Sequence, residues 1–494
     1  MSGWRERIAR LAPSILWVFA LYYASQIVVR VLLPDGLRID EAQQVLLSQW
    51  LAAGYDAQPP LYNWLQQLTF AIVGDYLVGL AVLKSIILFA IIATYHQLSR
   101  MLVKKASFAV LATLGLFLVP QMFWQAQRDL THTTATMLLL NLMMISAIMV
   151  LRSPKLPNYM LLGAAIGLGM LTKYNFALLL PALGLAVLLH PDGRARILDW
   201  RILAAAAVAA LIVLPHALWF IENLKVASSV TVARMGEEAG DIGRLGEIAI
   251  GLGNLGAIAF VIAAPTLAAF GFAFGKTTPR AWTTGTTESR FIGSFLAAIL
   301  VILVLLILAI TFTTVRDRWM LPLLQMLPLY LALKLEAQGL DPEAALRRLM
   351  PVALGIILLL PIATFIAGSR STSHYQQPFG SFRSAFTDRE RLAPAIIVTA
   401  DWAAAGNLKM RWPKAAVIST QFPNLRRAED WKSGEPVALV WRGDSAAAPA
   451  VLLDWAKSHL GADVSLPPAQ AISLPFTGHP QKPAPTFQYI LIRH

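Results

Sequence analysis

Long apolar runs recur along this chain from the N-terminus to about residue 367. Most of them approach or exceed the roughly 18 residues that a helix needs to cross a bilayer. They predict about eleven membrane-spanning helices, near residues 12–32, 76–98, 106–122, 131–150, 158–172, 175–190, 202–221, 246–274, 291–313, 319–335 and 349–367.

From about residue 368 the pattern changes to that of a soluble domain. Short runs rich in β-branched residues predict strands at 394–400, 415–420, 436–441 and 487–494, whereas 401–411 and 448–460 favour helices. We therefore expect a helical polytopic membrane domain over residues 1–367 and a small α/β domain over 368–494. No glycine-rich phosphate loop occurs in the second domain, so nucleotide binding has no support there.

The composition agrees with a membrane protein, because 57% of the 494 residues are hydrophobic and only 14% are charged. When the loops are counted alternately, basic residues gather on the side of the N-terminus, which predicts a cytoplasmic N-terminus. An odd number of spans then places the C-terminal domain outside, in the periplasm of a bacterial inner membrane. This asymmetry accounts for most of the net charge of +13 and requires no nucleic acid.

The absence of cysteine excludes disulfides and thiolate metal sites. The first span lacks a cleavage site and is expected to be a retained anchor.

Two adjacent carboxylates, Asp40 and Glu41, follow the first span. Asp40 is placed as the N-cap of a short amphipathic helix that lies in the membrane interface, with Gln43 as its capping-box partner. Gln58 and the two prolines after it then force an extended turn. A cap uses one carboxylate oxygen, so Asp40 could also accept a proton from a substrate hydroxyl.

A second acidic position, Asp129, lies between Arg128 and His132 at the outer end of a predicted span. It could be no more than a favourable partner of a helix dipole. Lys84 lies within a span, where it either snorkels to the interface or marks a functional site. The same membrane face also gathers other polar and basic residues, namely Lys173, His216, Asn223, Arg234, Arg316 and Arg318.

Carboxylates and cations at one interface suggest group transfer from an anionic lipid. A carboxylate can deprotonate an attacking hydroxyl, and lysine or arginine can hold a phosphate while charge develops on it. Nucleotide sugars are cytoplasmic, so a donor used on the outer face should be lipid-linked.

Five segments in this order resemble bacterial membrane glycosyltransferases of family 39, which belong to the GT-C class with protein O-mannosyltransferases and lipid A aminoarabinose transferases. The segments are DEAQQVLLSQWLAAGYDAQPPLYNWL, QRD, LGMLTKYNFALLLPAL, PHALWFIEN and DRWMLPLL. The resemblance covers roughly residues 30–335, and the tail resembles the outer soluble domain of some members.

The resemblance implies a GT-C fold and inverting transfer of one sugar from a polyprenyl-phosphate donor to an acceptor at the periplasmic face. It implies that Asp40 is the catalytic acidic residue, with Glu41 beside it and Asp129 as a second acidic position, and that Lys84 contacts the donor phosphate. Gln58 stands where many members have Lys or His, and Tyr174 stands where others have Gly, so both could alter selection of the donor headgroup. Lipid A or lipopolysaccharide core is the favoured acceptor, and a protein or a cell-wall polysaccharide is the alternative.

Two other function classes compete with the enzyme. A flippase or transporter of lipid-linked sugars would show internal repeats and a site near the midplane of the bilayer, and neither is apparent. A scaffold that presents the C-terminal domain to a partner would leave the interfacial charges unexplained. A divalent metal is possible but has no support, since His132 and His216 are far apart in sequence and are expected to be hydrogen-bonding residues or substrate contacts.

Overall fold

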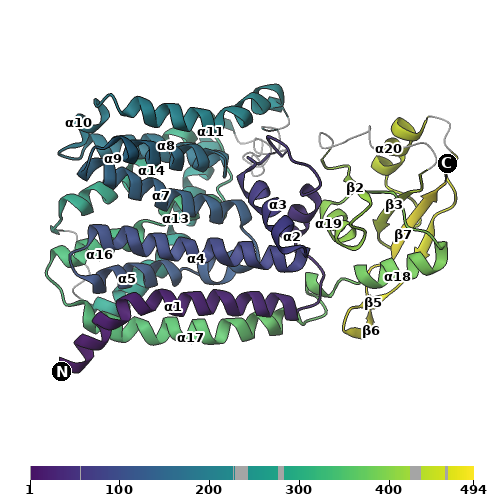
Figure 1. Ribbon diagram of the computed structural model, residues 1–494, viewed down its shortest axis with the longest axis horizontal. Coiled ribbons are helices and arrows are strands. Elements are labelled where there is room, and N and C mark those ends of the chain that lie inside the picture. The colour runs from purple at the N-terminus through teal and green to yellow at the C-terminus, as the bar shows by residue number, and fades with distance from the viewer. Residues whose placement is uncertain are drawn as a thin grey trace. The chain divides into compact units, whose positions relative to one another are not determined.

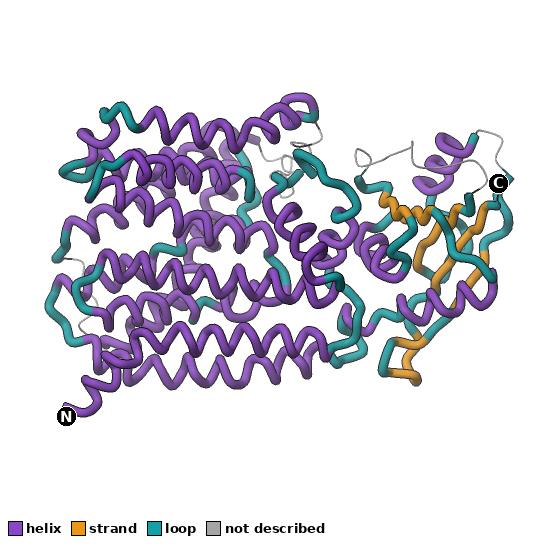
Figure 2. Tube along the Cα trace, in the orientation of Figure 1, coloured by secondary structure: helices purple, strands orange, loops and turns teal. Residues whose placement is uncertain are grey.

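The computed structural model describes residues 2–55, 57–225, 227, 243–275, 283–422, 435–461 and 465–493. The chain divides into two compact units, and each is described by itself. Unit 1 comprises residues 1–24, 57–62 and 84–359, and unit 2 comprises 25–56, 63–83 and 360–494. Figure 2 shows that the strands gather in one part of the chain, and every described strand lies after residue 395, within unit 2.

Within the described residues, 8 helices are long and apolar enough to cross a membrane, or 9 if one bent pair counts as a single span. The 8 spans are Ser14–Leu32, Tyr76–Leu102, Thr131–Arg152, Ile202–Glu222, Gly243–Phe274, Thr287–Ile310, Asp317–Ala337 and Pro342–Gly368. The sequence pattern predicted about eleven. The difference lies in the two shorter apolar helices, Leu156–Met170 and Tyr174–Leu188, which do not reach spanning length.

The helices of Figure 1 follow the apolar runs of the sequence. In chain order up to the soluble domain they are α1 (Ser2–Leu32), α2 (Ile39–Leu47), α3 (Leu61–Val73), α4 (Tyr76–Leu102), α5 (Ala106–Phe117), η1 (Gln121–Gln125), α6 (Ala126–Arg128), α7 (Thr131–Arg152), α8 (Leu156–Met170), η2 (Tyr174–Leu178), α9 (Leu179–Leu188), α10 (Gly193–Ile197), α11 (Ile202–Glu222), α13 (Gly243–Phe274), α14 (Thr287–Ile310), α15 (Asp317–Leu324), α16 (Leu327–Ala337) and α17 (Pro342–Gly368).

The bend after α5 determines where the segment that carries Asp129 begins. The axis turns by 67° between α5 and the stretch Gln121–Arg128. Pro120 lies in this break, and its missing N–H and its ring both disfavour a continuous helix. After the bend the backbone leaves the helix at Asp129, Leu130 adopts a left-handed conformation (φ 69°), and α7 starts at Thr131.

Within unit 1, α8 packs closely on α11 through two glycines four residues apart. A Cβ atom on Gly163 would lie 2.2 Å from the carbonyl oxygen of Ala205, and one on Gly167 would lie 3.0 Å from that of Ala209. Small residues at this spacing let two membrane helices bring their backbones together, where van der Waals contact supplies the attraction.

Unit 2 contains a five-stranded sheet of order β2-β1-β3-β7-β4. The first three strands of this order run parallel, and β7 pairs antiparallel with both β3 and β4. The strands are β1 (Ile396–Thr399), β2 (Ala416–Ser419), β3 (Val437–Arg442), β4 (Gln470–Ile472) and β7 (Phe487–Ile492), and β5 (Pro475–Phe476) forms a separate hairpin with β6 (His479–Pro483). The helices are η4 (His374–Gln376), α18 (Phe379–Glu390), α19 (Trp402–Arg411) and α20 (Ala450–Leu460).

The four predicted strands and two predicted helices are confirmed, whereas α18 and the strands β4, β5 and β6 were not predicted.

Alternate residues of the central strands enter two cores. Ile397 and Val440 belong to one core with α18 and α19, while Val398 and Leu439 belong to the other with α20. Because both faces of the sheet are covered, the strand sequences are continuously apolar rather than alternating.

The segment after α1 is part of the same unit. Leu46, Leu47 and Tyr55 are each 1% exposed and lie in the core that α18 and α19 form with the sheet. The side-chain amide of Gln49 donates to the carbonyl oxygen of Val417 (2.9 Å) and accepts from its N–H (3.0 Å). Since β2 is an outer strand among those the structure describes, this amide occupies backbone groups that a further strand would otherwise pair.

Candidate active site

The helix that carries Asp40 begins two positions earlier than the sequence suggested. The N-cap of α2 is Arg38, so Asp40 lies in the first turn and the prediction that it caps the helix is wrong. Glu41 provides the capping contact instead, because its carboxylate accepts the backbone N–H of Arg38 (3.0 Å). Asp40 is half-buried, and its position in the first turn places its negative charge favourably toward the helix dipole.

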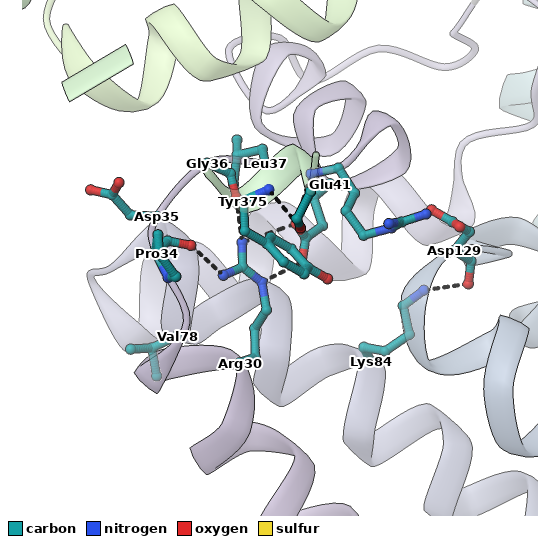
Figure 3. A network of polar contacts seen from close by, with 12 residues as sticks. Arg30, Pro34, Asp35, Gly36, Leu37, Glu41, Val78, Lys84, Asp129 and Tyr375 are labelled. Atoms are coloured by element: carbon teal, nitrogen blue, oxygen red, sulfur yellow. Dashed lines mark hydrogen bonds and ion pairs between the residues drawn. The ribbon is translucent and has the colours of Figure 1, made fainter. Parts of the chain in front are cut away.

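Glu41 also forms a buried ion pair with Arg30 at the end of α1 (Figure 3). The guanidinium donates from Nε to Oε1 at 2.7 Å and from Nη2 to Oε2 at 3.0 Å, which is a bidentate geometry. The ring of Tyr375 lies 4.4 Å from the Arg30 Cζ atom. Glu41 therefore holds the loop in place, and its predicted catalytic role stays a prediction.

The loop between α2 and α3 is held by buried polar contacts within unit 2. Tyr55 donates its hydroxyl to the carbonyl of Trp50 at 2.6 Å, and Gln67 of α3 donates to that same carbonyl at 2.6 Å. Burial raises the pKa of Tyr55 above its ordinary value, so the phenol remains a neutral donor.

In unit 1 the second acidic position meets a lysine. Lys84 of α4 donates from Nζ to the backbone carbonyl of Asp129 at 2.6 Å, as the dashed line in Figure 3 shows. Both side chains are half-buried. Arg128 places its guanidinium 4.9 Å from the ring of Trp124, a cation–π contact. The lysine and the carboxylate-bearing residue that the sequence singled out separately are thus neighbours.

A second lysine joins three segments of unit 1. Lys173 donates from Nζ to the Thr133 hydroxyl at 3.1 Å and to the Arg318 carbonyl at 3.2 Å. Asn175 donates to the carbonyl of Trp319 at 3.2 Å, which ties η2 to the start of α15. Arg316 is the N-cap of α15, and the side chains of both arginines are half-buried.

The remaining predicted residues form smaller groups. His216 stacks between Tyr174 and Trp219, with ring centroids 5.8 Å and 5.7 Å away. His132 is 6% exposed and lies 5.6 Å from the ring of Tyr62.

Three predicted residues lie apart from these groups. Asn223 is the C-cap of α11 and donates its side-chain amide to the Trp219 carbonyl. Gln58 is half-buried before the two prolines. Arg234 lies outside the described residues. In the part of the chain that the structure describes, no group of three or more His, Asp or Glu side chains is arranged to hold a metal ion.

Sequence reasoning missed the residues that fix this geometry. Thr133 and Asn175 carry no charge and lie among similar polar residues, so nothing in the sequence distinguishes them. Arg30 ends an apolar run, where a basic residue normally indicates only the membrane boundary. The pairing of Arg30 with Glu41 could have been inferred only by knowing how the loop after α1 folds.

Comparisons with known proteins agree with this architecture. Residues 57–219 match the family model described as dolichyl-phosphate-mannose-protein mannosyltransferase. The chain is 37% identical over 473 residues to the lipopolysaccharide core galacturonosyltransferase RgtB of Rhizobium johnstonii, covering 94% of each chain. It is 35% identical over 477 residues to RgtA of the same organism, covering 95% of each.

Among solved structures, the chain resembles ArnT from Cupriavidus metallidurans bound to undecaprenyl phosphate, with a TM-score of 0.60 and 14% identity. The match covers 97% of this chain and 98% of that one. The apo form of the same protein matches with a TM-score of 0.57. At this identity the likeness concerns the fold.

Proposed function

Because the chain belongs to the family of membrane glycosyltransferases that includes RgtA and RgtB, we propose that it transfers one galacturonosyl residue from a polyprenyl-phosphate donor to the lipopolysaccharide core. The observation that carries this proposal is identity of 37% across 94% of both chains, which leaves no large segment of the relative without a counterpart. The fold shared with ArnT, which was crystallised with undecaprenyl phosphate, supports a polyprenyl-phosphate donor.

The proposed reaction takes place at the periplasmic face of the inner membrane. The basic residues of the loops favour a cytoplasmic N-terminus. Counting the bent pair as one span gives 9 spans among the described residues, an odd number, so the proposal places the C-terminal domain in the periplasm with the loop that carries Asp40. The transmembrane catalytic part corresponds to residues 1–367 and the soluble part to 368–494.

In the proposed mechanism the acceptor hydroxyl oxygen attacks the anomeric carbon of the donor. The bond from that carbon to the phosphate oxygen breaks, and polyprenyl phosphate leaves with the bonding electrons. A single displacement of this kind inverts the anomeric configuration. Asp40 takes the proton of the acceptor hydroxyl, a role that suits a half-buried carboxylate at the start of a helix.

The lysines of unit 1 are proposed to serve the anionic groups of the donor. Lys84 and Lys173 each donate to a backbone carbonyl oxygen, and this bond holds their ammonium groups in place within unit 1. A donor that carries both a phosphate and a uronate has two negative groups, which matches a site with two anchored lysines and nearby arginines. Asp129, which lies beside Lys84, is proposed as the second acidic residue of the site.

The test is mass spectrometry of lipopolysaccharide core from cells that lack this gene and from the same cells restored with wild-type or variant protein. We expect the deletion to lose one hexuronosyl mass, wild type to restore it, and Asp40→Asn to fail although the protein is made at normal levels. Asp75→Asn is the matched control, because Asp75 is exposed and asparagine can replace its capping contact with the N–H of Val78.

Three results would count against the proposal. An unchanged core in the deletion strain would refute it. Loss of a different sugar mass would refute the galacturonosyl donor. Full restoration by Asp40→Asn would refute the role of Asp40 as base.

A further inference from the structure

The segment that carries Asp40 is held from both sides by residues of the C-terminal domain, more than 300 positions later in the chain. Leu37 is 2% exposed, and its backbone N–H donates to the Oδ1 atom of Asn407 at 2.9 Å. Asn407 is itself 3% exposed, and its Nδ2 atom donates to the carbonyl of Ala403 at 2.8 Å. That second bond fixes the orientation of the side-chain amide and leaves its oxygen directed at Leu37.

The preceding residue of α19, Gly406, allows the two helices to approach. A Cβ atom on Gly406 would lie 2.0 Å from the carbonyl oxygen of Ala42, far inside contact distance. Glycine is therefore required where the backbone of α19 meets α2, only two residues beyond Asp40. Ala42 is fully buried at this contact.

Two further contacts hold the stretch before α2. Arg411, at the end of α19, pairs with the carboxylate of Asp35 and donates to its backbone carbonyl at 3.1 Å. The N–H of Gly36 donates to the carbonyl of Tyr375 at 3.2 Å. The segment 35–42 therefore has a contact with residues after 370 at Asp35, Gly36, Leu37 and Ala42.

We propose that the C-terminal domain is a positioning element for the catalytic carboxylate, and that Asn407 is its principal positioning residue. The contact at Leu37 fixes the chain three residues before Asp40, and the contact at Gly406 fixes it two residues after. A neutral amide oxygen that accepts a buried hydrogen bond brings no charge to the substrate, so Asn407 acts only through the loop. This inference rests on the proposed role of Asp40 in glycosyl transfer.

The energetic basis is the sensitivity of catalysis to geometry. A displacement of about 1 Å of a catalytic group, caused by a change outside the site, can lower the rate about 100-fold. Asn407→Ala removes the acceptor for the Leu37 N–H and leaves that buried donor unsatisfied. We expect it to lower kcat about 10- to 100-fold, while the KM for the donor stays within about twofold, because the lysines proposed to hold the donor belong to unit 1.

The matched control is Gln488→Ala. Gln488 is a buried amide of the same domain that donates to a backbone carbonyl, that of Gly443, without contacting the loop. A second variant, Asn407→Asp, keeps an acceptor oxygen for Leu37 but loses the bond to Ala403 that orients it, so its kcat should lie between those of Asn407→Ala and wild type. The enzyme is assayed in nanodiscs with polyprenyl-phosphate galacturonate and lipopolysaccharide core.

Hydrogen exchange supplies a measurement that does not depend on the sugar transferred. Asn407→Ala should accelerate amide exchange across residues 37–42, and Gln488→Ala should leave it unchanged. If Asn407→Ala keeps wild-type kcat, or if Gln488→Ala lowers kcat equally, the positioning role is wrong. If wild type transfers no galacturonate, the proposed function fails, and the exchange experiment still decides whether Asn407 orders the loop.

Discussion

Asp40 and Glu41 are adjacent carboxylates, and removing the negative charge of each should have a different effect on the stability of unit 2. Glu41→Gln leaves the guanidinium of Arg30 without its bidentate partner, although its bonds to the carbonyls of Gly36 (3.0 Å) and Pro34 (3.3 Å) remain. Asp40→Asn removes a charge from a half-buried position in the first turn of α2. We therefore expect Glu41→Gln to destabilise unit 2 and Asp40→Asn to leave its stability nearly unchanged.

The magnitude follows from the burial of the pair. The side chains of Arg30 and Glu41 are 9% and 13% exposed, so solvent screens their interaction only weakly. Removing one partner of a buried pair costs about 3–5 kcal/mol, mainly because the other charge stays buried. Arg30 keeps two carbonyl acceptors and the ring of Tyr375, so we expect the lower end, about 3 kcal/mol. For Asp40→Asn we expect less than about 1 kcal/mol, the usual contribution of one charge near the start of a helix.

The assay is amide hydrogen exchange of the purified protein in nanodiscs, read at the buried strands β1 and β3, which report the opening of unit 2. A loss of about 3 kcal/mol accelerates exchange there about 150-fold. The double variant Arg30→Met/Glu41→Leu removes both charges and should recover most of the protection. Unchanged exchange in Glu41→Gln would refute the structural role, and lost transfer with unchanged exchange would assign Glu41 to the chemistry.

The remaining predictions concern two lysines. Lys84→Ala should raise the donor KM or lower the rate by about tenfold, since one charged contact contributes about 1.5–3 kcal/mol; unchanged donor kinetics would refute the proposed contact of Lys84 with the donor. Burial lowers the pKa of Lys409 to about 8, so between about pH 8 and 10.5 the unfolded state binds more protons than the folded one. The stability of unit 2 should therefore rise with pH across that interval. Thermal unfolding of wild type should show this rise relative to Lys409→Met, and equal slopes would contradict it.

The local sequence was sufficient to predict those helices and strands that depend mainly on their own residues. The β-branched runs at 396–399 and 437–442 became strands, and Asp401 accepts from the N–H groups of Ala403 and Ala404 at the start of α19, as a typical N-cap does. The long apolar helices were likewise predictable, because length and hydropathy alone define them. The count of spans was not predictable, because two apolar segments fold into helices too short to qualify.

The arrangement of the candidate site depended on contacts that leave no local pattern. Asn407 lies 370 positions from Leu37, and neither residue is unusual in its own surroundings. The cap of α2 was misplaced for a related reason. Aspartate is a common N-cap, but the pair of Glu41 with Arg30 and with the backbone of Arg38 fixes the chain so that the helix starts earlier. Charged residues such as Lys84, Lys173 and Asp129 could be selected in advance, because charge beside a membrane is costly wherever it occurs.

The hydrogen bonds between Gln49 and Val417 join two residues that are synthesised at different times. An edge strand with unpaired backbone groups can associate with other chains, and β2, an outer strand among those described, would be such an edge without Gln49. Gln49 leaves the ribosome 368 residues before Val417, so the group that covers this edge exists before the strand is made. A hybrid of two relatives that exchanged only residues 368–494 would separate the edge from its cover. Productive exchange of the soluble domain should therefore require transfer of residues 33–55 together with it.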